Sequence, residues 1–236
     1  MDIARLRAAF PDRHIEYYEE IDSTMRIAAC LEPGAVVLAG RQTAGQGRHG
    51  HSWHSEPCNG IYCSVVLAPG PFLTLALGLA AQHAVVEATR LVCDLRWPND
   101  LMLNSRKVAG ILVQLVDRRA VAGIGINVNH SAFPPALAAE ATSLRLVAGR
   151  ALAREPILLA LLPAIDAFTA EPGQTILRLF THASSYAVGR RVTVEQPGGA
   201  ITGTTAGLDP SGYLMVRQDD GTVTLIVAGG VRAAGA

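Results

Sequence analysis

A glycine-rich stretch with basic side chains, RQTAGQGRHGHSW, occupies residues 41–53. Glycines at this spacing disfavour a regular helix or strand, but they let a backbone turn tightly and approach a ligand closely. With Arg48 and its own N–H groups, the stretch has the composition of an anion-binding loop. An isolated glycine-rich run is more often a mobile surface loop, so this interpretation depends on a second group of residues.

That second group is LRWPNDLMLNSRKVAGILVQL at residues 95–115. It contains Lys107, the only lysine among the 20 basic residues of the chain. A third candidate is the pair Ser23 and Thr24, which follows Asp22 just before an apolar segment. These residue types favour a helix N-terminus, where their hydroxyls either cap the helix or bind a polar ligand.

The composition excludes several classes of protein. Half of the 236 residues are hydrophobic and 17% are charged, which favours a folded chain with a sizeable core. The net charge is zero and no basic cluster is long enough for a nucleic-acid surface. The four cysteines form no CxxC pair, the N-terminus lacks a signal peptide, and the longest apolar run is too short to span a bilayer. We therefore expect a soluble cytoplasmic protein.

The elements that must position these residues alternate between strands and helices. Apolar periodicity and turn residues predict strands at 14–21, 35–42, 60–69, 94–98 and 120–130, a hairpin over 101–117, and helices at 2–9, 25–32, 72–92, 154–170 and 174–183. Gly123 and Gly125 lie within a predicted strand, which indicates that something approaches its backbone closely. Beyond residue 186, short strands separated by PGG, DPSG and DDG turns indicate a small all-β module.

Together the motifs RQTAGQGRHGHSW, RWPNDLMLNSRKVAGIL and GIGINVN resemble those of the biotin protein ligases, also called biotin–[acetyl-CoA-carboxylase] ligases. The resemblance covers nearly the whole chain. It implies an α+β catalytic domain with a mixed sheet and packed helices over residues 1–185, and a small SH3-like β-barrel over 186–236. The pattern begins within about twenty residues of Met1, fewer than the ~40 that an independent domain needs, so we expect no DNA-binding domain and no repressor role.

The resemblance also implies roles for individual residues. The implied contacts of biotin are Ser23, Thr24, Met25, Gln42, Gln46, Gly47, Arg48 and Lys107. The implied contacts of ATP or the adenylate are Arg48, His51, Trp53, Asn99, Lys107 and Asn127. Four positions depart from the family pattern: Gln46, His49 and His51 stand where arginine is usual or frequent, and Met25 where asparagine is common. Fewer loop cations imply weaker phosphate binding, although the reaction itself does not depend on them.

The implied reaction joins the carboxylate of biotin to the α-phosphate of ATP and then transfers biotin to a lysine of a biotin carboxyl carrier domain. Bringing a carboxylate beside a polyphosphate requires fixed cations, and Lys107 and Arg48 are the candidate catalytic residues. Mg²⁺ is the implied partner of the outer phosphates. Asp100 is either a metal ligand or a turn-capping residue, and Trp53 either packs on adenine or holds the base of the loop.

Two other functions remain open from the sequence. A lipoate–protein ligase shares the adenylation chemistry, although its loop carries adjacent glycines beside paired arginines. A non-catalytic biotin-binding protein needs neither Lys107 nor Arg48. A P-loop nucleotidase is excluded because no GxxxxGK[ST] motif occurs, and a dinucleotide-binding turn is excluded because no helix can begin through HSWHSEPCNG.

Overall fold

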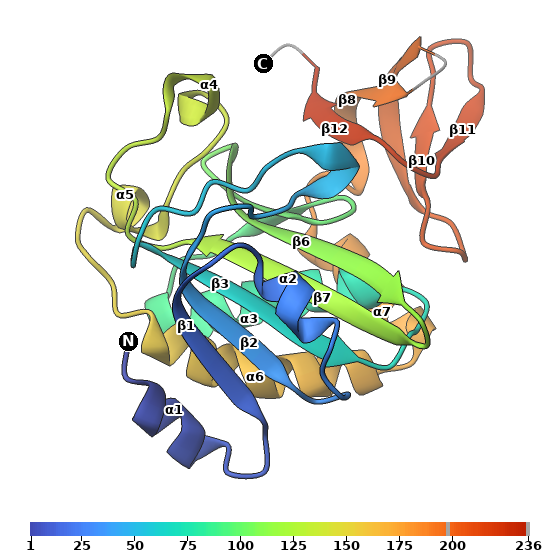
Figure 1. Ribbon diagram of the computed structural model, residues 1–236. Coiled ribbons are helices and arrows are strands. Elements are labelled where there is room, and N and C mark those ends of the chain that lie inside the picture. The colour runs from blue at the N-terminus through green and yellow to red at the C-terminus, as the bar shows by residue number, and fades with distance from the viewer. Residues whose placement is uncertain (197–198, 235–236) are drawn as a thin grey trace.

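Two β-sheets of different character organise the chain (Figure 1). The computed structural model describes residues 1–196 and 199–234. The first sheet has seven strands in the order β1-β2-β3-β7-β6-β5-β4, in which β1 and β2 are parallel and the other neighbours are antiparallel. Its strands are β1 (Ile15–Ile21), β2 (Val36–Gln42), β3 (Gly60–Leu67), β4 (Asp94–Arg96), β5 (Asp100–Leu103), β6 (Arg106–Val116) and β7 (Arg119–Asn127). The predicted mixed sheet is therefore confirmed.

Helices cover both faces of this sheet unequally. The helices are α1 (Ile3–Ala9), α2 (Thr24–Ala28), α3 (Leu73–Thr89), α4 (Pro135–Ala138), α5 (Leu144–Ala148), α6 (Glu155–Ala170) and α7 (Gly173–Ala183), with a 3₁₀ turn, η1, at Arg48–Gly50. The helices α3 and α6 pack together behind the sheet, whereas the short α2 lies across its front (Figure 1). The short helices α4 and α5, of about one turn each, were not predicted from the sequence.

The long helix α3 forms the centre of the main core. It is apolar around most of its circumference, as expected for a helix enclosed on all sides. Residues such as Leu77 and Ala81 are fully buried, and the helix packs against both the sheet and α6. Pro163 lies inside α6, and the helix continues through it.

The front of the sheet is hollowed because two neighbouring strands, β6 and β7, carry three glycines there. Gly110 of β6 is opposite Gly125 of β7, and Gly123 lies two residues earlier on the same face. Successive residues of a strand point to opposite faces, so Ile124 and Ile126 fill the core behind while the glycines leave space in front. This confirms the expected close approach: an added Cβ on Gly123 would lie 2.8 Å from the sulfur of Met25, and one on Gly125 would collide with the Trp53 ring.

The second sheet is antiparallel and has five strands in the order β11-β10-β9-β8-β12. They are β8 (Val188–Gln196), β9 (Gly199–Leu208), β10 (Leu214–Arg217), β11 (Val223–Ile226) and β12 (Gly230–Ala233). The predicted all-β C-terminal module is thus confirmed. Among the pairings of the described strands, none joins β11 to β12, so closure of this sheet into a barrel is not observed.

No helix in the described part of the chain is both long enough and apolar enough to cross a membrane.

Candidate functional site

The N-terminus of α2 places two hydroxyls at the front of the sheet. Ser23 stands at the N-cap position, yet its side chain makes no capping hydrogen bond. Its Oγ is buried, and it finds no hydrogen-bond partner within residues 1–196 and 199–234. A buried hydroxyl without a partner is unfavourable unless a ligand supplies one. The capping interpretation of the Ser23 side chain is therefore wrong.

Thr24 is held by a small polar network. Its backbone N–H and its hydroxyl lie 2.8 and 3.0 Å from Oε1 of Gln42, and the hydroxyl is 2.8 Å from Oγ of Ser64. Ser64 was not predicted as a site residue, although it is a lone hydroxyl in the otherwise apolar second half of the strand GIYCSVVL. The network fixes the amide of Gln42 beside Ser23, so this end of the site presents several donors and acceptors.

The glycine-rich stretch folds as a short hairpin over the front of the sheet. Gln46 pairs with Ser52, and the N–H of Gly47 donates to the carbonyl of His51 at 2.7 Å. The turn between them is η1, in which Gly50 has a φ of 78°. A side chain on Gly47 would lie only 3.2 Å from that carbonyl, so the absence of a Cβ allows the two arms to approach.

Trp53 follows the hairpin and lies on the glycine face of the sheet. The Nζ of Lys107 is 5.6 Å from the centre of its ring, within the range of a cation–π interaction. The indole Nε1 is buried and makes no hydrogen bond with the described residues. Trp53 is thus half-buried, above Gly125 and beside the ammonium of Lys107, and it does not belong to the main core. Trp97, by contrast, belongs to that core.

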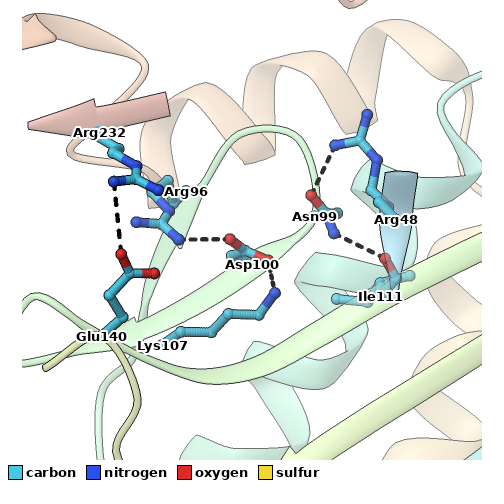
Figure 2. A network of polar contacts seen from close by, with 8 residues as sticks. All are labelled: Arg48, Arg96, Asn99, Asp100, Lys107, Ile111, Glu140 and Arg232. Atoms are coloured by element: carbon cyan, nitrogen blue, oxygen red, sulfur yellow. Dashed lines mark hydrogen bonds and ion pairs between the residues drawn. The ribbon is translucent and has the colours of Figure 1, made fainter. Parts of the chain in front are cut away.

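Asp100 lies between two cations (Figure 2). Its carboxylate oxygens are 2.5 Å from the Nζ of Lys107 and 2.7 Å from the Nη2 of Arg96. Burial alone raises the pKa of Asp100, but the charges and hydrogen bonds of Lys107 and Arg96 outweigh it and hold the pKa below its usual range. The carboxylate is therefore ionised and fixes Lys107 at the start of β6.

Arg48 is held by Asn99, the residue that precedes Asp100. Its Nη1 donates to Oδ1 of Asn99 at 3.0 Å, and the amide nitrogen of Asn99 donates to the carbonyl of Ile111 at 2.9 Å (Figure 2). Burial lowers the pKa of Arg48, and the charge of Asp100 partly offsets this effect. Because arginine stays protonated in proteins, the site contains two fixed cations, Arg48 and Lys107.

Two cavities meet at these cations. The smaller has a volume of about 40 Å³ and contains the polar end of the site with Ser23, Thr24 and Gln42. The larger has a volume of about 750 Å³ and extends toward the second sheet. Five residues line both cavities: Gly47, Arg48, Trp53, Asn99 and Lys107. Anionic groups placed in the two cavities would therefore face each other across the cations.

The remaining predicted residues divide between the two cavities. Met25 and Gln46 line the smaller one, whereas His49, His51 and Asn127 line the larger one. The side chain of Asn127 is buried and donates to the carbonyl of Thr142 at 3.1 Å. The structure thus brings together all of the predicted site residues. It adds Ser64, Arg96, Glu140 and Arg232, of which Glu140 and Arg232 lie 3.6 Å apart at the edge of the larger cavity (Figure 2).

His130 lies behind the wall of the larger cavity and predicts a pH-dependent stability. Its ring stacks on Phe133, with the centroids 5.2 Å apart, and burial lowers its pKa to about 4. An unfolded histidine titrates near 6.5, so below that pH the unfolded chain takes up a proton that the folded chain excludes. We expect stability to fall by about 2 to 3 kcal/mol between pH 6.5 and 4, and to show no further loss from this group below pH 4.

Urea unfolding of the wild type and of His130→Gln, measured from pH 7 to 3.5, checks this expectation. The variant should lose less stability over this range than the wild type. His83→Gln, at an exposed position, serves as the control and should follow the wild type. Parallel pH profiles for all three proteins would contradict the expectation.

A protein-held metal ion is not supported by the side chains. Both oxygens of Asp100 already face cations. In the ranges 1–196 and 199–234, no group of three His, Cys, Asp or Glu residues has the geometry of a metal site. Asp100 is an ion-pair partner of Lys107 and Arg96, and its side chain accepts no turn-capping hydrogen bond from the described backbone.

Comparison with known proteins identifies the family. Residues 17–131 match the biotin/lipoate A/B protein ligase family, and residues 187–231 match the biotin protein ligase C-terminal domain. The chain is 34% identical to the biotin–[acetyl-CoA-carboxylase] ligase of Mycobacterium tuberculosis, over 84% of this chain and 77% of that protein. It is 30% identical to the bifunctional ligase/repressor BirA of Bacillus subtilis, over 92% of this chain and 73% of that protein.

A solved structure with the same fold contains two bound ligands, biotin and ATP. The biotin protein ligase from Aquifex aeolicus in complex with biotin and ATP superposes with a TM-score of 0.85 at 30% identity, covering 94% of this chain and 99% of that chain. The match includes both sheets. The chain belongs to the biotin protein ligase family.

Proposed function

We propose that this chain activates biotin with ATP and transfers it to a lysine of a biotin carboxyl carrier domain. The observation that carries the proposal is the meeting of two cavities at Lys107 and Arg48. One cavity is small and rich in hydrogen-bonding groups, and the other has room for a nucleotide. Two fixed cations at their junction lie where a carboxylate and an α-phosphate must approach each other.

In the first step, a carboxylate oxygen of biotin attacks the α-phosphorus of ATP, and pyrophosphate leaves with the bonding electron pair. Both reacting groups are anionic, so their repulsion opposes the step. Lys107 and Arg48 offset this repulsion, and they need little reorganisation because Asp100 and Asn99 already hold them. In the second step, the amine of the carrier lysine attacks the acyl carbonyl, AMP leaves, and the amine loses a proton.

The polar end of the smaller cavity matches the ureido ring of biotin. A ureido group has two N–H donors and one carbonyl acceptor, and Ser23, Thr24 and Gln42 present complementary groups. Ser64 supports this end through the hydroxyl of Thr24. We assign the adjoining residues Met25, Gln46 and Gly47 to the same subsite. A dithiolane ring, as in lipoate, would leave this polar end without partners, which favours biotin over lipoate.

We infer that the hairpin moves when biotin enters. The centres of water molecules have only about 40 Å³ of space in the smaller cavity, so a bicyclic substrate would fit tightly there. The hairpin around Arg48 and the adjoining Trp53 form the part of the wall that has few apolar anchors. We infer that this segment moves outward to admit biotin and returns once the adenylate has formed, which would shield it from water.

The nucleotide is assigned to the larger cavity. His51, Trp53, Asn99 and Asn127 all line it beside Lys107. Trp53 offers a ring face and an Nε1 that no described residue accepts a hydrogen bond from, so both adenine packing and support of the hairpin are compatible with its position. Mg²⁺ accompanies ATP on its phosphates, and we assign no protein ligand to it.

The larger cavity also supplies a route for the acceptor lysine. One wall belongs to the catalytic domain, which we assign to residues 1–185, and the other includes Glu195, Val231 and Arg232 of the C-terminal module, residues 186–236. We propose that this module has the SH3-like fold of the family and helps to receive the carrier. The four cysteines are all free, which suits the reducing cytoplasm as the place of the reaction.

Pyrophosphate exchange tests the proposed function. The protein is incubated with ATP, labelled pyrophosphate and either biotin or lipoate, and label entering ATP is measured. Biotin-dependent exchange is the expected result. Exchange that depends on lipoate instead would identify a lipoate ligase. Biotin binding without exchange would identify a non-catalytic binding protein.

Ser23→Ala should separate ligand binding from stability. Its buried hydroxyl has no partner among the described residues, so removing it should leave the free energy of unfolding unchanged or slightly higher. Loss of one hydrogen bond should weaken biotin binding about 3- to 10-fold. Isothermal titration and urea unfolding measure the two effects.

The control for Ser23→Ala is Thr205→Ala. This buried hydroxyl accepts a hydrogen bond from the backbone of Arg190 in the second sheet, away from the cavities. It should lower stability by about 1 kcal/mol without changing biotin binding. If Ser23→Ala destabilises the protein and binds biotin as well as the wild type, its hydroxyl does not face the ligand.

A further inference from the structure

A tight turn of the C-terminal module reaches into the catalytic domain. The turn Asp209–Tyr213 joins β9 to β10, and its shape is fixed from within. Oδ1 of Asp209 accepts hydrogen bonds from the backbone N–H groups of Ser211 at 3.0 Å and Tyr213 at 2.8 Å. Gly212 completes the turn with a φ of 82°, a conformation that L side chains rarely adopt.

Gly212 contacts two aromatic residues of the catalytic domain. Its carbonyl accepts a hydrogen bond from the indole Nε1 of Trp97 at 3.0 Å, and this indole is buried. Its α-carbon faces Phe72, and an added Cβ would lie 2.9 Å from the ring. The turn therefore fits between Phe72 and Trp97 only because residue 212 has no side chain.

Trp97 leads directly into the residues that hold the two cations. Two residues further along the chain, Asn99 contacts Arg48, and the next residue, Asp100, contacts Lys107. A fixed indole at Trp97 thus anchors one end of a short segment whose other end positions both cations. A further cavity of about 300 Å³ is lined both by Gly212 and by Arg48, which shows how close the turn lies to the site.

We propose that the turn Asp209–Tyr213 is a positioning element for adenylate formation. It acts through the Trp97 indole, which sets the place of Asn99 and Asp100, and through them the guanidinium of Arg48 and the ammonium of Lys107. The C-terminal module then serves the first step of the reaction as well as reception of the carrier. This inference rests on the proposed function, because adenylate formation is the step that it concerns.

The same sheet offers a matched control turn. Gly221 has a φ of 87°, close to that of Gly212, but an added Cβ there would meet no atom within 4 Å. Oδ1 of Asp220 caps this turn through the N–H of Thr222 at 2.9 Å. In the described part of the chain, the side-chain hydrogen bonds of residues 218–222 stay within the second sheet. Gly212→Ala and Gly221→Ala thus carry similar backbone strain, whereas only the first disturbs the contact with Phe72 and Trp97.

The experiment measures biotin-dependent pyrophosphate exchange in full-length Gly212→Ala and Gly221→Ala. A second pair, Asp209→Ala and Asp220→Ala, loosens each turn without adding a side chain, and Asp209→Asn should restore function because an amide oxygen also accepts hydrogen bonds. We expect Gly212→Ala and Asp209→Ala to lower kcat about 5- to 20-fold, while the KM for biotin stays within about 2-fold. The two variants of the control turn and Asp209→Asn should match the wild type.

A spectroscopic readout shows whether the indole anchor is lost. The chain has two tryptophans, so the indole region of a ¹⁵N spectrum contains two N–H signals, and comparison with Trp53→Phe assigns them. Hydrogen exchange of the Trp97 signal should be slow in the wild type and at least 10-fold faster in Gly212→Ala and Asp209→Ala. It should be unchanged in the variants of the control turn.

The outcomes separate this inference from the proposed function. If the wild-type protein is active, two results would overturn the positioning role alone. One is an equal kcat for the variants of the Asp209–Tyr213 turn and the variants of the control turn. The other is a lower kcat of the Gly212→Ala and Asp209→Ala variants without faster exchange of the Trp97 indole N–H. A wild-type protein without biotin-dependent exchange would overturn the proposed function and the positioning role together.

Discussion

Lys107→Arg should slow adenylate formation by about 10²-fold or more while leaving the fold and most biotin binding intact. An ammonium is a compact charge that fits between two anions, whereas a guanidinium is a planar fork that needs more room. In this site the room is limited, because Lys107 packs beside Gly110 and under Trp53. An added Cβ on Gly110 would already lie 2.9 Å from Nζ, so a larger head group has to displace its neighbours.

Single-turnover formation of the adenylate measures this effect, and Arg106→Lys is the control. Residue 106 is the exposed neighbour of Lys107, so the same exchange of cations there should leave the rate unchanged. An amine-reactive reagent gives an independent test in the wild type, because its only targets are Lys107 and the N-terminus. Biotin plus ATP should shield Lys107 and leave the N-terminus reactive. Full labelling of Lys107 at saturating ligand concentrations would remove it from the site.

Asp100→Asn should reduce both activity and stability. The change leaves Arg96 and Lys107 close together without their shared counter-ion, and Lys107 loses the contact that orients it. We expect pyrophosphate exchange to fall at least 10-fold and the free energy of unfolding to fall by about 2 kcal/mol at pH 7. Because the pKa of Asp100 is lowered in the folded state, its stabilising effect is present above about pH 4 and is lost as the pH falls through the folded value.

The difference in stability between the wild type and Asp100→Asn should therefore shrink in acid, and urea unfolding at pH 7 and pH 3 measures it. Asp166→Asn is the matched control. Asp166 pairs with Arg13 at 2.6 Å, but its side chain is 55% exposed, so this change should cost less than about 1 kcal/mol and leave exchange unaltered. If both variants behave alike, Asp100 does not position Lys107.

Regular patterns in the sequence predicted most of the fold. The run GIGIN contains glycine at 123 and 125 and isoleucine at 124 and 126, and this period of two identifies a strand with one filled face and one open face. The hairpin over residues 101–117 was also predicted, and its turn contains Asn104, a residue type that tolerates the positive φ of 49° found there. The short helices α4 and α5 were missed because a single helical turn has too few residues to show periodicity.

The sequence motifs named most of the residues that the fold brings together at the site. The contacts that were not predicted join residues that lie far apart in the sequence. Ser64 reaches Thr24 only because β3 passes under the start of α2. The ion pairs of Asp100 were not predicted, because a turn sequence does not show that Lys107 and Arg96 converge on one carboxylate. The contact of Gly212 with Trp97 joins residues 115 positions apart, and the DPSG sequence shows only that a turn occurs there.

The ion pair between Asp100 and Lys107 also bears on self-modification, the reaction of the enzyme's own amines with the adenylate that it forms. A mixed anhydride of biotin and AMP acylates free amines, and the nearest amine is that of Lys107. The Nζ of Lys107 lies 2.5 Å from a carboxylate oxygen of Asp100, so this amine is engaged in an ion pair. The other 19 residues of the Lys and Arg total are all arginine, and the guanidinium of arginine is a poor nucleophile at neutral pH. The chain thus presents few targets for self-biotinylation: the N-terminal amine and one lysine, whose side chain is paired with a carboxylate.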